Sequence, residues 1–205
     1  MRGYVVAGIG TEVGKTVVSA ILVEKLRADY WKPVQTGDLD SSDTLQVQRL
    51  AAHRGVLHPE AWRLKAPMSP HAAAEIEGLR IRHVSLKLPQ CGTTLIVELA
   101  GGLMVPLDSR PGHELSNIDL LEEWGLPVVL VTNYYLGSIN HTLLSVHALR
   151  SRDIALTGLV FNGEALQGSR SAILNLTGLN VLLDLPWTNN LDTAFISAQA
   201  ARLEL

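Results

Sequence analysis

Gly-Ile-Gly-Thr-Glu-Val-Gly-Lys-Thr, residues 8–16, follows the apolar run 4–7 and precedes an apolar segment with helical spacing at 17–26. A strand, a glycine-bearing turn that ends in Gly-Lys-Thr, and a helix together predict a phosphate-binding loop. Backbone N–H groups of such a turn point at phosphate oxygens, and the helix dipole adds positive potential there. The stretch therefore indicates an α/β domain that binds a nucleotide.

Two side chains of this loop have expected roles. We expect Lys15 to reach the β- and γ-phosphates and Thr16 to place its hydroxyl on Mg²⁺. The spacing departs from the common form, because Ile9 occupies the position of the first glycine and glycines stand on either side of it. The alternative is a flexible turn with a solvated lysine, but the strand and helix around it favour the phosphate loop.

Length and composition limit the classes of protein to consider. The chain has 205 residues, of which 47% are hydrophobic and 18% charged, and its net charge is −3. We expect one domain, residues 1–205, with no broad basic surface for nucleic acid. No apolar run reaches the roughly 18 residues of a membrane-spanning helix, so no membrane insertion is expected. Cys91 is the single cysteine and no signal peptide is recognised, which favours the cytoplasm.

Apolar runs of strand length recur along the chain, and most are separated by segments with helical spacing. The runs are rich in Val, Ile and Leu without polar alternation, which is typical of parallel strands buried on both faces. We expect a single-domain parallel sheet flanked by helices on both faces, the α/β fold of P-loop NTPases. The expected strands are 4–7, 94–99, 127–132, 156–161 and 180–185, and the expected helices are 14–28, 43–53, 118–124, 140–150, 169–176 and 193–203.

Polar residues near the ends of these runs are candidates for chemistry, because ligands of open α/β sheets bind outside the carboxyl ends of the strands. Glu98 lies near the end of the strongest apolar run, before two glycines, and suits a Mg²⁺ shell. Lys32 could neutralise charge on a transferring phosphoryl group, and Asp43 could join Glu98 and Thr16 around the metal. Taken singly, each is also compatible with a solvated side chain or a helix cap.

Two further positions suggest ligand contacts. Ser138 lies in a turn that leads into a helix, where free N–H groups suit a carboxylate, although Ser138 is also a good N-cap. Asn162 follows the run 156–161, where its amide could read the edge of an adenine base. Taken alone, a structural role is favoured for Asn162.

Six motifs, in this order, resemble the dethiobiotin synthetase family, whose members close a ureido ring with ATP in biotin biosynthesis. They are Gly-x-x-Thr-Glu-Val-Gly-Lys-Thr at 8–16, Lys-Pro-Val-x-x-Gly at 32–37, Ser-Pro-His-x-Ala-Ala at 69–74, Val-Glu-x-Ala-Gly-Gly at 97–102, Leu-Gly-x-Ile-Asn-His at 136–141 and Leu-Pro-Trp at 185–187. The resemblance runs from Val5 to about Trp187. It implies a homodimeric ligase that uses 7,8-diaminononanoate, carbon dioxide and ATP.

The resemblance also implies roles for individual residues. Lys32 and Lys15 would be catalytic, and Thr16, Asp43 and Glu98 would bind Mg²⁺. The implied nucleotide contacts are Glu12, Val13, Gly14, Lys15, Thr16, Val17, Asp43, Glu98, Leu99, Ala100, Gly101, Asn162, Gly163, Pro186 and Trp187. The implied substrate contacts are Thr11, Thr36, Ser138, Ile139 and Asn140, of which the last three would receive the substrate's carboxylate across a homodimer interface.

The implied reaction has three steps. One amine adds to carbon dioxide, the resulting carbamate takes the γ-phosphoryl group to give a carbamic-phosphoric anhydride, and the second amine displaces phosphate to close a cyclic urea. Each step depends on positioning more than on acid–base catalysis. Lys15, Lys32 and Mg²⁺ would act mainly by offsetting negative charge.

Four positions depart from the family pattern. Gly10 replaces an aspartate, Leu99 a glycine, Tyr135 a lysine and Gly163 an aspartate. Leu99 could crowd the nucleotide, and Gly163 could weaken base discrimination. These departures bear on nucleotide affinity and specificity more than on the reaction.

Two alternative functions stay open at this point. A partner-regulated P-loop ATPase switch is the first, although such proteins usually carry a second lysine early in the loop, where this chain has glycines around Ile9. The second is a nucleotide binder without activity, which Gly10 and Leu99 would explain. The lysines and oxygen ligands that phosphoryl transfer needs are nevertheless all present.

Overall fold

The computed structural model describes residues 2–205 and contains in that range a seven-stranded sheet with the strand order β11-β10-β9-β1-β6-β2-β4. Every adjacent pair of strands is parallel. The strands are β1 (Gly3–Gly8), β2 (Asp29–Trp31), β4 (Leu57–His58), β6 (Leu95–Gly102), β9 (Val128–Asn133), β10 (Leu156–Asn162) and β11 (Val181–Leu185). The predicted parallel α/β fold is confirmed.

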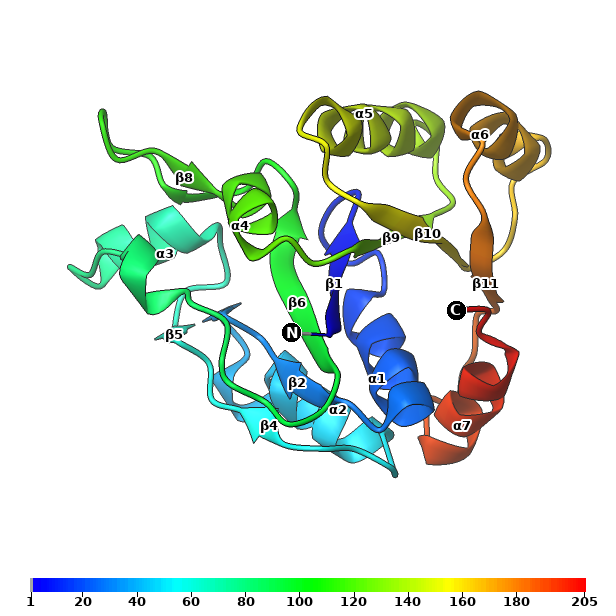
Figure 1. Cartoon of the computed structure of the whole chain (residues 1–205), viewed down its shortest axis with the longest axis horizontal. Helices are drawn as coiled ribbons and strands as arrows, with labels where there is room; N and C mark the ends of the chain where they lie inside the picture. The colour runs from blue at the N-terminus through cyan, green and yellow to red at the C-terminus, as the bar shows by residue number, and fades with distance from the viewer. Residues whose placement is uncertain (1) are drawn as a thin grey trace.

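Helices cover both faces of this sheet (Figure 1). One face carries α1 (Lys15–Leu26), α2 (Asp43–Leu50) and α7 (Thr193–Arg202), and the other carries α4 (Asn117–Trp124), α5 (Ser138–Ser151) and α6 (Ser169–Thr177). Strand β1 shows how the two cores arise, because Val6 packs on the α1 face while Val5 and Ala7 pack on the other. Because all seven strands are parallel, their carboxyl ends lie along the same edge of the sheet.

Short elements form a side lobe, which we define as β3 (Val34–Thr36), β5 (Trp62–Leu64), β7 (Pro106–Asp108), β8 (Leu115–Ser116) and α3 (Pro70–Ile76). Strands β3 and β5 pair in parallel, and β7 and β8 pair in an antiparallel ribbon. A separate apolar cluster that includes Leu64, Ala73 and Leu107 fills this lobe. Figure 1 shows α3, β5 and β8 on the side of the molecule opposite α6 and α7.

All five predicted strands and all six predicted helices are present, with shifted ends. The first predicted helix, 14–28, stops at Leu26 because Arg27 adopts a left-handed conformation with φ 49°. The predicted helix 43–53 stops at Leu50, where the next residue is extended and the backbone N–H of His53 donates to the Glu24 carboxylate. Sequence patterns did not predict β2, β4 or the side lobe, whose strands are two or three residues long.

Membrane insertion was not expected, and among residues 2–205 no helix has the length and apolar character needed to span a bilayer.

Candidate active site

The loop between β1 and α1 has the geometry of a phosphate-binding turn. A Cβ on Gly8 would lie 2.6 Å from the Val13 side chain, and one on Gly14, whose φ is 96°, would lie 2.3 Å from the amide of Asn162. Glycine is thus required at both positions. Lys15 arches back over the loop and donates from Nζ to the Gly10 carbonyl at 2.9 Å.

Lys15 is buried and has no carboxylate in direct contact among the described residues. Burial, and then the positive charge of Lys32, lower the pKa of Lys15 to about 8, although Glu98 and Asp43 partly oppose this shift. The loop therefore holds a buried lysine whose positive charge is not balanced by a contacting carboxylate, which is expected for a group that binds phosphate oxygens.

Three oxygen-bearing side chains converge beside the loop. Thr16 Oγ1 lies 2.9 Å from Asp43 Oδ1 and 2.9 Å from Glu98 Oε1, although these partners are 27 and 82 residues away in the sequence. Such a set suits Mg²⁺, which takes one or two carboxylates and completes its shell with substrate phosphates and water. No group of three or more His, Cys, Asp or Glu side chains placed for a metal occurs in the described range, so a closed all-protein cage is not present there.

Lys32 joins these residues to form what we call the carboxylate cluster: Lys32, Asp43, Glu98 and the Thr16 hydroxyl. Lys32 Nζ lies 2.6 Å from Asp43 Oδ2 and 3.1 Å from Glu98 Oε1, and it donates to the Leu99 carbonyl at 3.3 Å. Burial alone would lower the pKa of Lys32, but Glu98 and Asp43 outweigh it and raise that pKa. Burial likewise opposes ionisation of Asp43, yet Lys32 and Thr16 outweigh it and lower the pKa of Asp43.

Sequence analysis missed three residues that support the cluster. Tyr30, fully buried on β2, donates from its hydroxyl to Glu98 Oε2 at 2.9 Å, and burial followed by Glu98 raises its pKa well above 10. Gln35 accepts from the Asp43 backbone N–H at 3.2 Å. Asn117 donates to the carbonyls of residues 100 and 102 at 2.8 Å each. Of these three residues only Gln35 lies inside a recognised motif, the one at 32–37, so the sequence could have pointed to Gln35 but not to the other two.

The glycine-bearing turn after Glu98 lies along the same edge of the sheet. The Leu99 side chain is fully buried in the core on the opposite face from Tyr30 and the α1 helix, so its carbonyl and not its side chain faces Lys32. The effect of Leu99 on nucleotide binding stays a prediction. Ala100 and Gly101 follow at the end of β6, and Gly101 is held with φ 72°.

The predicted base-binding residues gather at the ends of β10 and β11. Asn162 Nδ2 donates to the Val13 carbonyl at 3.0 Å and so ties the end of β10 to the phosphate loop. The Gly163 N–H donates to the Leu185 carbonyl at 2.9 Å, which brings Gly163 beside the Leu-Pro-Trp motif. The indole of Trp187 is 66% exposed there. The Asn162 amide thus contacts the loop, and an exposed aromatic ring follows two residues after the end of β11.

The predicted carboxylate-binding turn begins α5. Gly137, with φ 108°, is the N-cap, so the alternative role of Ser138 as N-cap is wrong: Ser138 is the first helical residue. Its hydroxyl is buried, and no hydrogen-bond partner for it occurs among residues 2–205. Ile139 and Asn140 follow in the first turn, while Leu136 just before it is completely exposed.

Thr11 and Thr36, the remaining predicted substrate contacts, belong to different elements. Thr11 is exposed in the phosphate loop, and Thr36 ends β3 at the start of the side lobe. Glu12 has a left-handed backbone with φ 57°, and Val17 lies in the first turn of α1. The structure thus distributes the predicted residues over the phosphate loop, the carboxylate cluster, the ends of β10 and β11, and the turn before α5.

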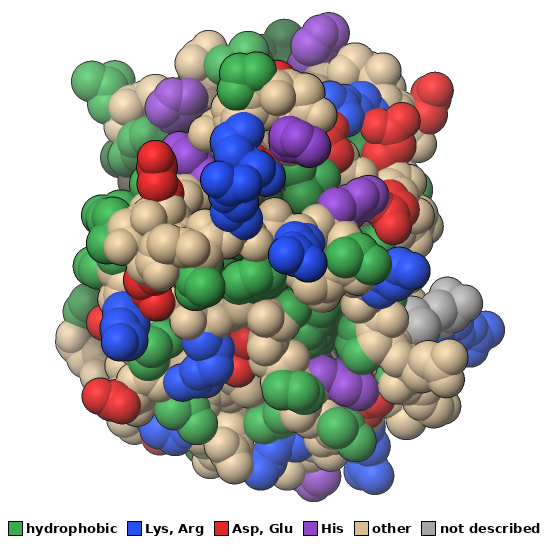
Figure 2. Space-filling view, turned by 90° about the vertical axis from the view of Figure 1, so that its left-hand side faces the viewer, with side chains coloured by type: hydrophobic (Ala, Val, Ile, Leu, Met, Phe, Trp, Pro, Cys, Tyr) green, Lys and Arg blue, Asp and Glu red, His purple; other side chains and the backbone are tan. Residues whose placement is uncertain are grey.

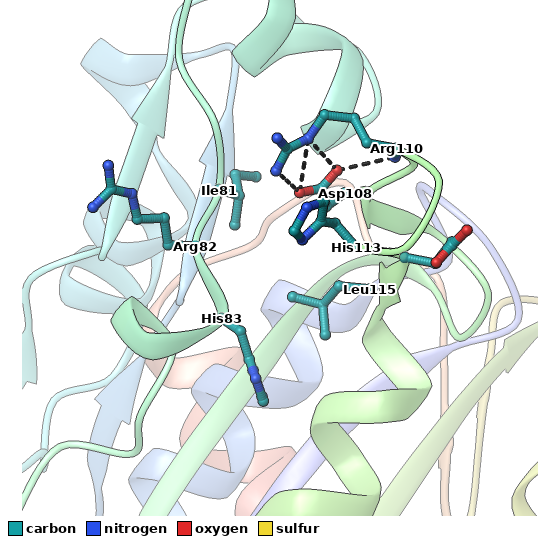
Figure 3. A pocket seen from close by; sticks show the side chains of 8 residues that line it. Ile81, Arg82, His83, Asp108, Arg110, His113 and Leu115 are labelled. Atoms are coloured by element: carbon teal, nitrogen blue, oxygen red, sulfur yellow. Dashed lines mark hydrogen bonds and ion pairs between the residues drawn. The ribbon is translucent and has the colours of Figure 1, made fainter.

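A cavity of about 380 Å³ lies in the side lobe, away from these residues. Figure 3 shows Arg110 paired with Asp108, next to His113, with Arg82 and His83 on a facing segment. Figure 2, which faces this lobe, shows histidine side chains gathered around a basic group in its upper half. Asp108 pairs with Arg110, and the Glu123 carboxylate lies against the His83 ring. None of the predicted site residues lines this cavity.

Known proteins with similar folds define the class. The family described as AAA domain matches residues 2–194. A ParA family ATPase from Chlorobium tepidum superposes with a TM-score of 0.54 and 10% identity, covering 98% of this chain and 97% of that one. A plasmid partition protein from Borrelia burgdorferi gives 0.56 and 11%, with coverages of 98% and 95%. The chain is thus a nucleotide-binding protein with the P-loop NTPase fold.

Sequence relatives are more specific. An ATP-dependent dethiobiotin synthetase from Christiangramia forsetii is 47% identical over 182 residues, which are 88% of this chain and 86% of that protein. A protein of the same name from Cytophaga hutchinsonii is 43% identical over 99% of this chain and 97% of its own length. The chain belongs to the ATP-dependent dethiobiotin synthetase family, and the predicted family resemblance is confirmed.

Proposed function

We propose that this protein is an ATP-dependent ligase of biotin biosynthesis that joins 7,8-diaminononanoate and carbon dioxide into dethiobiotin. The observation that carries the proposal is the convergence of Lys15, Thr16, Lys32, Asp43 and Glu98 at one edge of the sheet, in a chain that belongs to this family. Two lysines and three oxygen ligands are the groups that phosphoryl transfer to a carbamate requires.

The proposed chemistry conserves atoms at each step. A neutral amine attacks carbon dioxide and loses one proton to give a carbamate. A carbamate oxygen then attacks the γ-phosphorus of ATP, ADP leaves, and a carbamic-phosphoric anhydride forms. The second amine attacks the carbonyl carbon, phosphate leaves with the electron pair of the C–O bond, a proton is released, and the ring closes.

The two lysines would act at the phosphoryl step. In this step an anionic carbamate approaches an anionic triphosphate. Preorganised positive charge should therefore be the main factor that lowers the activation barrier. Lys15 lies on the loop that would cradle the phosphates, together with backbone groups of Glu12, Val13 and Gly14. Lys32 is held beside the loop by both carboxylates.

Thr16, Asp43 and Glu98 are the residues proposed to hold Mg²⁺. The Thr16 hydroxyl lies within hydrogen-bond distance of a carboxylate oxygen of Asp43 and of one of Glu98. Carboxylate oxygens are hard ligands of the type that Mg²⁺ prefers. When bound, the ion would neutralise phosphate charge and orient the triphosphate. The protein's own part is to hold Asp43 and Glu98 beside Thr16, which Lys32 does through its ion pairs with both carboxylates.

The nucleotide would lie along the carboxyl ends of the strands, with its phosphates at the phosphate loop and its base at the ends of β10 and β11. Asn162 keeps a free carbonyl oxygen and one N–H after its bond to Val13, which suits an adenine edge. Gly163, Pro186 and the exposed Trp187 would border the base. Val17, Leu99, Ala100 and Gly101 would complete the nucleotide contacts.

The substrate's carboxylate is proposed to bind at the start of α5. The first-turn N–H groups of Ile139 and Asn140 and the buried Ser138 hydroxyl favour an anion there, whereas the Ser138 N–H already donates to the Tyr135 carbonyl at 3.0 Å. Leu136 is fully exposed next to this turn, and the family resemblance implies that the turn lies at a homodimer interface. We therefore propose a homodimer in which this turn serves the partner's site, with Thr11 and Thr36 contacting the diamine.

The cytoplasm is the proposed compartment, since Cys91 is the single cysteine of the chain and remains a free thiol.

The decisive experiment measures ADP release by the purified protein with ATP, Mg²⁺ and bicarbonate, with and without 7,8-diaminononanoate, while mass spectrometry follows the cyclic urea. We expect ADP only with the diamine, in equal amount to dethiobiotin. Nucleotide binding without any response to the diamine would overturn the proposal and favour an ATPase switch or an inactive binder. Lys25→Ala, an exposed change on α1, provides a matched control.

A further inference from the structure

The buried phenol of Tyr30 lies directly behind the carboxylate cluster. Strands β2 and β6 are neighbours, and Tyr30 is opposite Ile96 in their register. Glu98, two residues beyond Ile96, points to the same face of the sheet as Tyr30. The Tyr30 hydroxyl therefore reaches Glu98 Oε2, and the O···O distance is 2.9 Å.

The two oxygens of Glu98 serve different partners. Oε1 faces Thr16 and Lys32, at 2.9 Å and 3.1 Å, on the side of the phosphate loop. Oε2 accepts the hydrogen bond from Tyr30. Glu98 is 1% exposed and Tyr30 is fully buried, so water has little access to Oε2 if the phenol hydroxyl is removed. The hydroxyl consequently fixes which way the carboxylate faces.

We propose that Tyr30 is a positioning residue that orients Glu98 toward Thr16 and thereby sets the affinity of this site for Mg²⁺ with nucleotide. Outer partners of ligating carboxylates orient them in this way, and their loss commonly weakens metal binding about 10- to 100-fold. The inference rests on the proposed function, because it takes Glu98 to be a Mg²⁺ ligand. It adds a residue of β2, outside every recognised motif, to the determinants of that site.

The test uses the full chain and the Tyr30→Phe variant, which keeps the aromatic ring in the core and removes only the hydroxyl. Thermal unfolding is measured with ADP at fixed concentration while Mg²⁺ is titrated, and separately with ADP and EDTA. We expect the Mg²⁺ concentration that gives the half-maximal rise in Tm to increase about 10- to 100-fold. The rise in Tm given by ADP without Mg²⁺ should stay as in the parent protein.

Turnover gives a second readout. Tyr30→Phe should raise the Mg²⁺ concentration needed for half-maximal ADP release while leaving kcat at saturating Mg²⁺ within a few-fold. A purely structural hydroxyl would lower Tm equally under all conditions and leave both Mg²⁺ midpoints unchanged, and that result overturns the inference.

Two further variants separate the possible failures. Tyr4→Phe removes a hydroxyl from a ring that packs on the same core from β1, and it should leave the Mg²⁺ midpoint unchanged. Glu98→Gln should raise the midpoint at least as much as Tyr30→Phe. If Glu98→Gln raises it and Tyr30→Phe does not, the role of Tyr30 is wrong and the metal assignment stands. If neither raises it, Glu98 is not a Mg²⁺ ligand and both proposals fail.

Discussion

The phosphate loop and the carboxylate cluster each hold one buried lysine, and they treat it in opposite ways. The loop gives Lys15 a backbone carbonyl as its partner, and its pKa falls to about 8. The cluster gives Lys32 two carboxylates, and its pKa rises. The loop is thus prepared to gain negative charge from a ligand, whereas the cluster lysine is already paired with carboxylates of the protein. Residue type alone does not distinguish these two lysines, but their partners do.

The largest effect should follow loss of the loop lysine. Lys15→Ala should abolish most nucleotide binding and lower turnover by at least about 10² to 10³, the usual cost of one preorganised electrostatic contact. ADP affinity by calorimetry and ADP release with the diamine would measure both. Near-parental affinity in this variant, compared with Lys25→Ala, would show that the loop does not depend on its lysine.

Loss of the cluster lysine should separate turnover from binding. Lys32→Ala should lower turnover by about 10² to 10³ with a smaller change in ADP affinity. It also removes the only lysine in direct contact with Asp43 and Glu98 among the described residues, so Tm should fall in EDTA and recover partly when Mg²⁺ is added. Lys65→Ala in the side lobe, where the lysine is exposed, is the control. Equal losses of turnover and affinity would remove the distinction between the two regions.

The pH dependence of nucleotide affinity should report on Lys15. Below its pKa of about 8 the free protein already carries the charged lysine. Above that pH a proton must be taken up on binding, so affinity for ADP should fall by up to about tenfold per pH unit. Titrations from pH 6.5 to 9.5 in buffers of different ionisation enthalpy would count the proton. Lys15→Arg should flatten this part of the profile, and an equally steep fall there would assign it to another group.

The smallest effect should come from placing a carboxylate near the loop lysine, as the cluster does for Lys32. A side chain on Gly10 would meet no atom within 4 Å of its Cβ, so Gly10→Asp should fold normally. Its carboxylate would lie near Lys15 and raise that pKa, moving the pH midpoint of ADP affinity upward by less than about one unit. A midpoint that stays in place would mean that the new carboxylate is fully screened by solvent.

Sequence patterns were sufficient for the main sheet because its longer strands are continuous apolar runs and its helices have clear spacing. They failed for β2 and β4, since two or three residues carry too little periodicity to distinguish a strand from a loop. Helix α3 had an available signal, because Pro70 follows Ser69 at a helix start.

The candidate site divides in the same way. Lys15 and Thr16 follow from local motif spacing, and Glu98 follows from its place near the end of an apolar run. Asp43 was a candidate beside them that the family resemblance also implied. The contact between Tyr30 and Glu98 joins residues 68 positions apart. It depends on β2 pairing with β6, and no local pattern contains that pairing.

Because Thr16, Asp43 and Glu98 come from three distant segments, the site exists only after α1, α2 and β6 have assembled. Such non-local pairing is slow to form, and a partly folded chain has no complete site to offer. A ligand that binds there stabilises the whole domain by mass action, with no affinity for the unfolded chain. Nucleotide and Mg²⁺ should consequently act as late folding ligands, which protect the entire chain from proteolysis in one cooperative step.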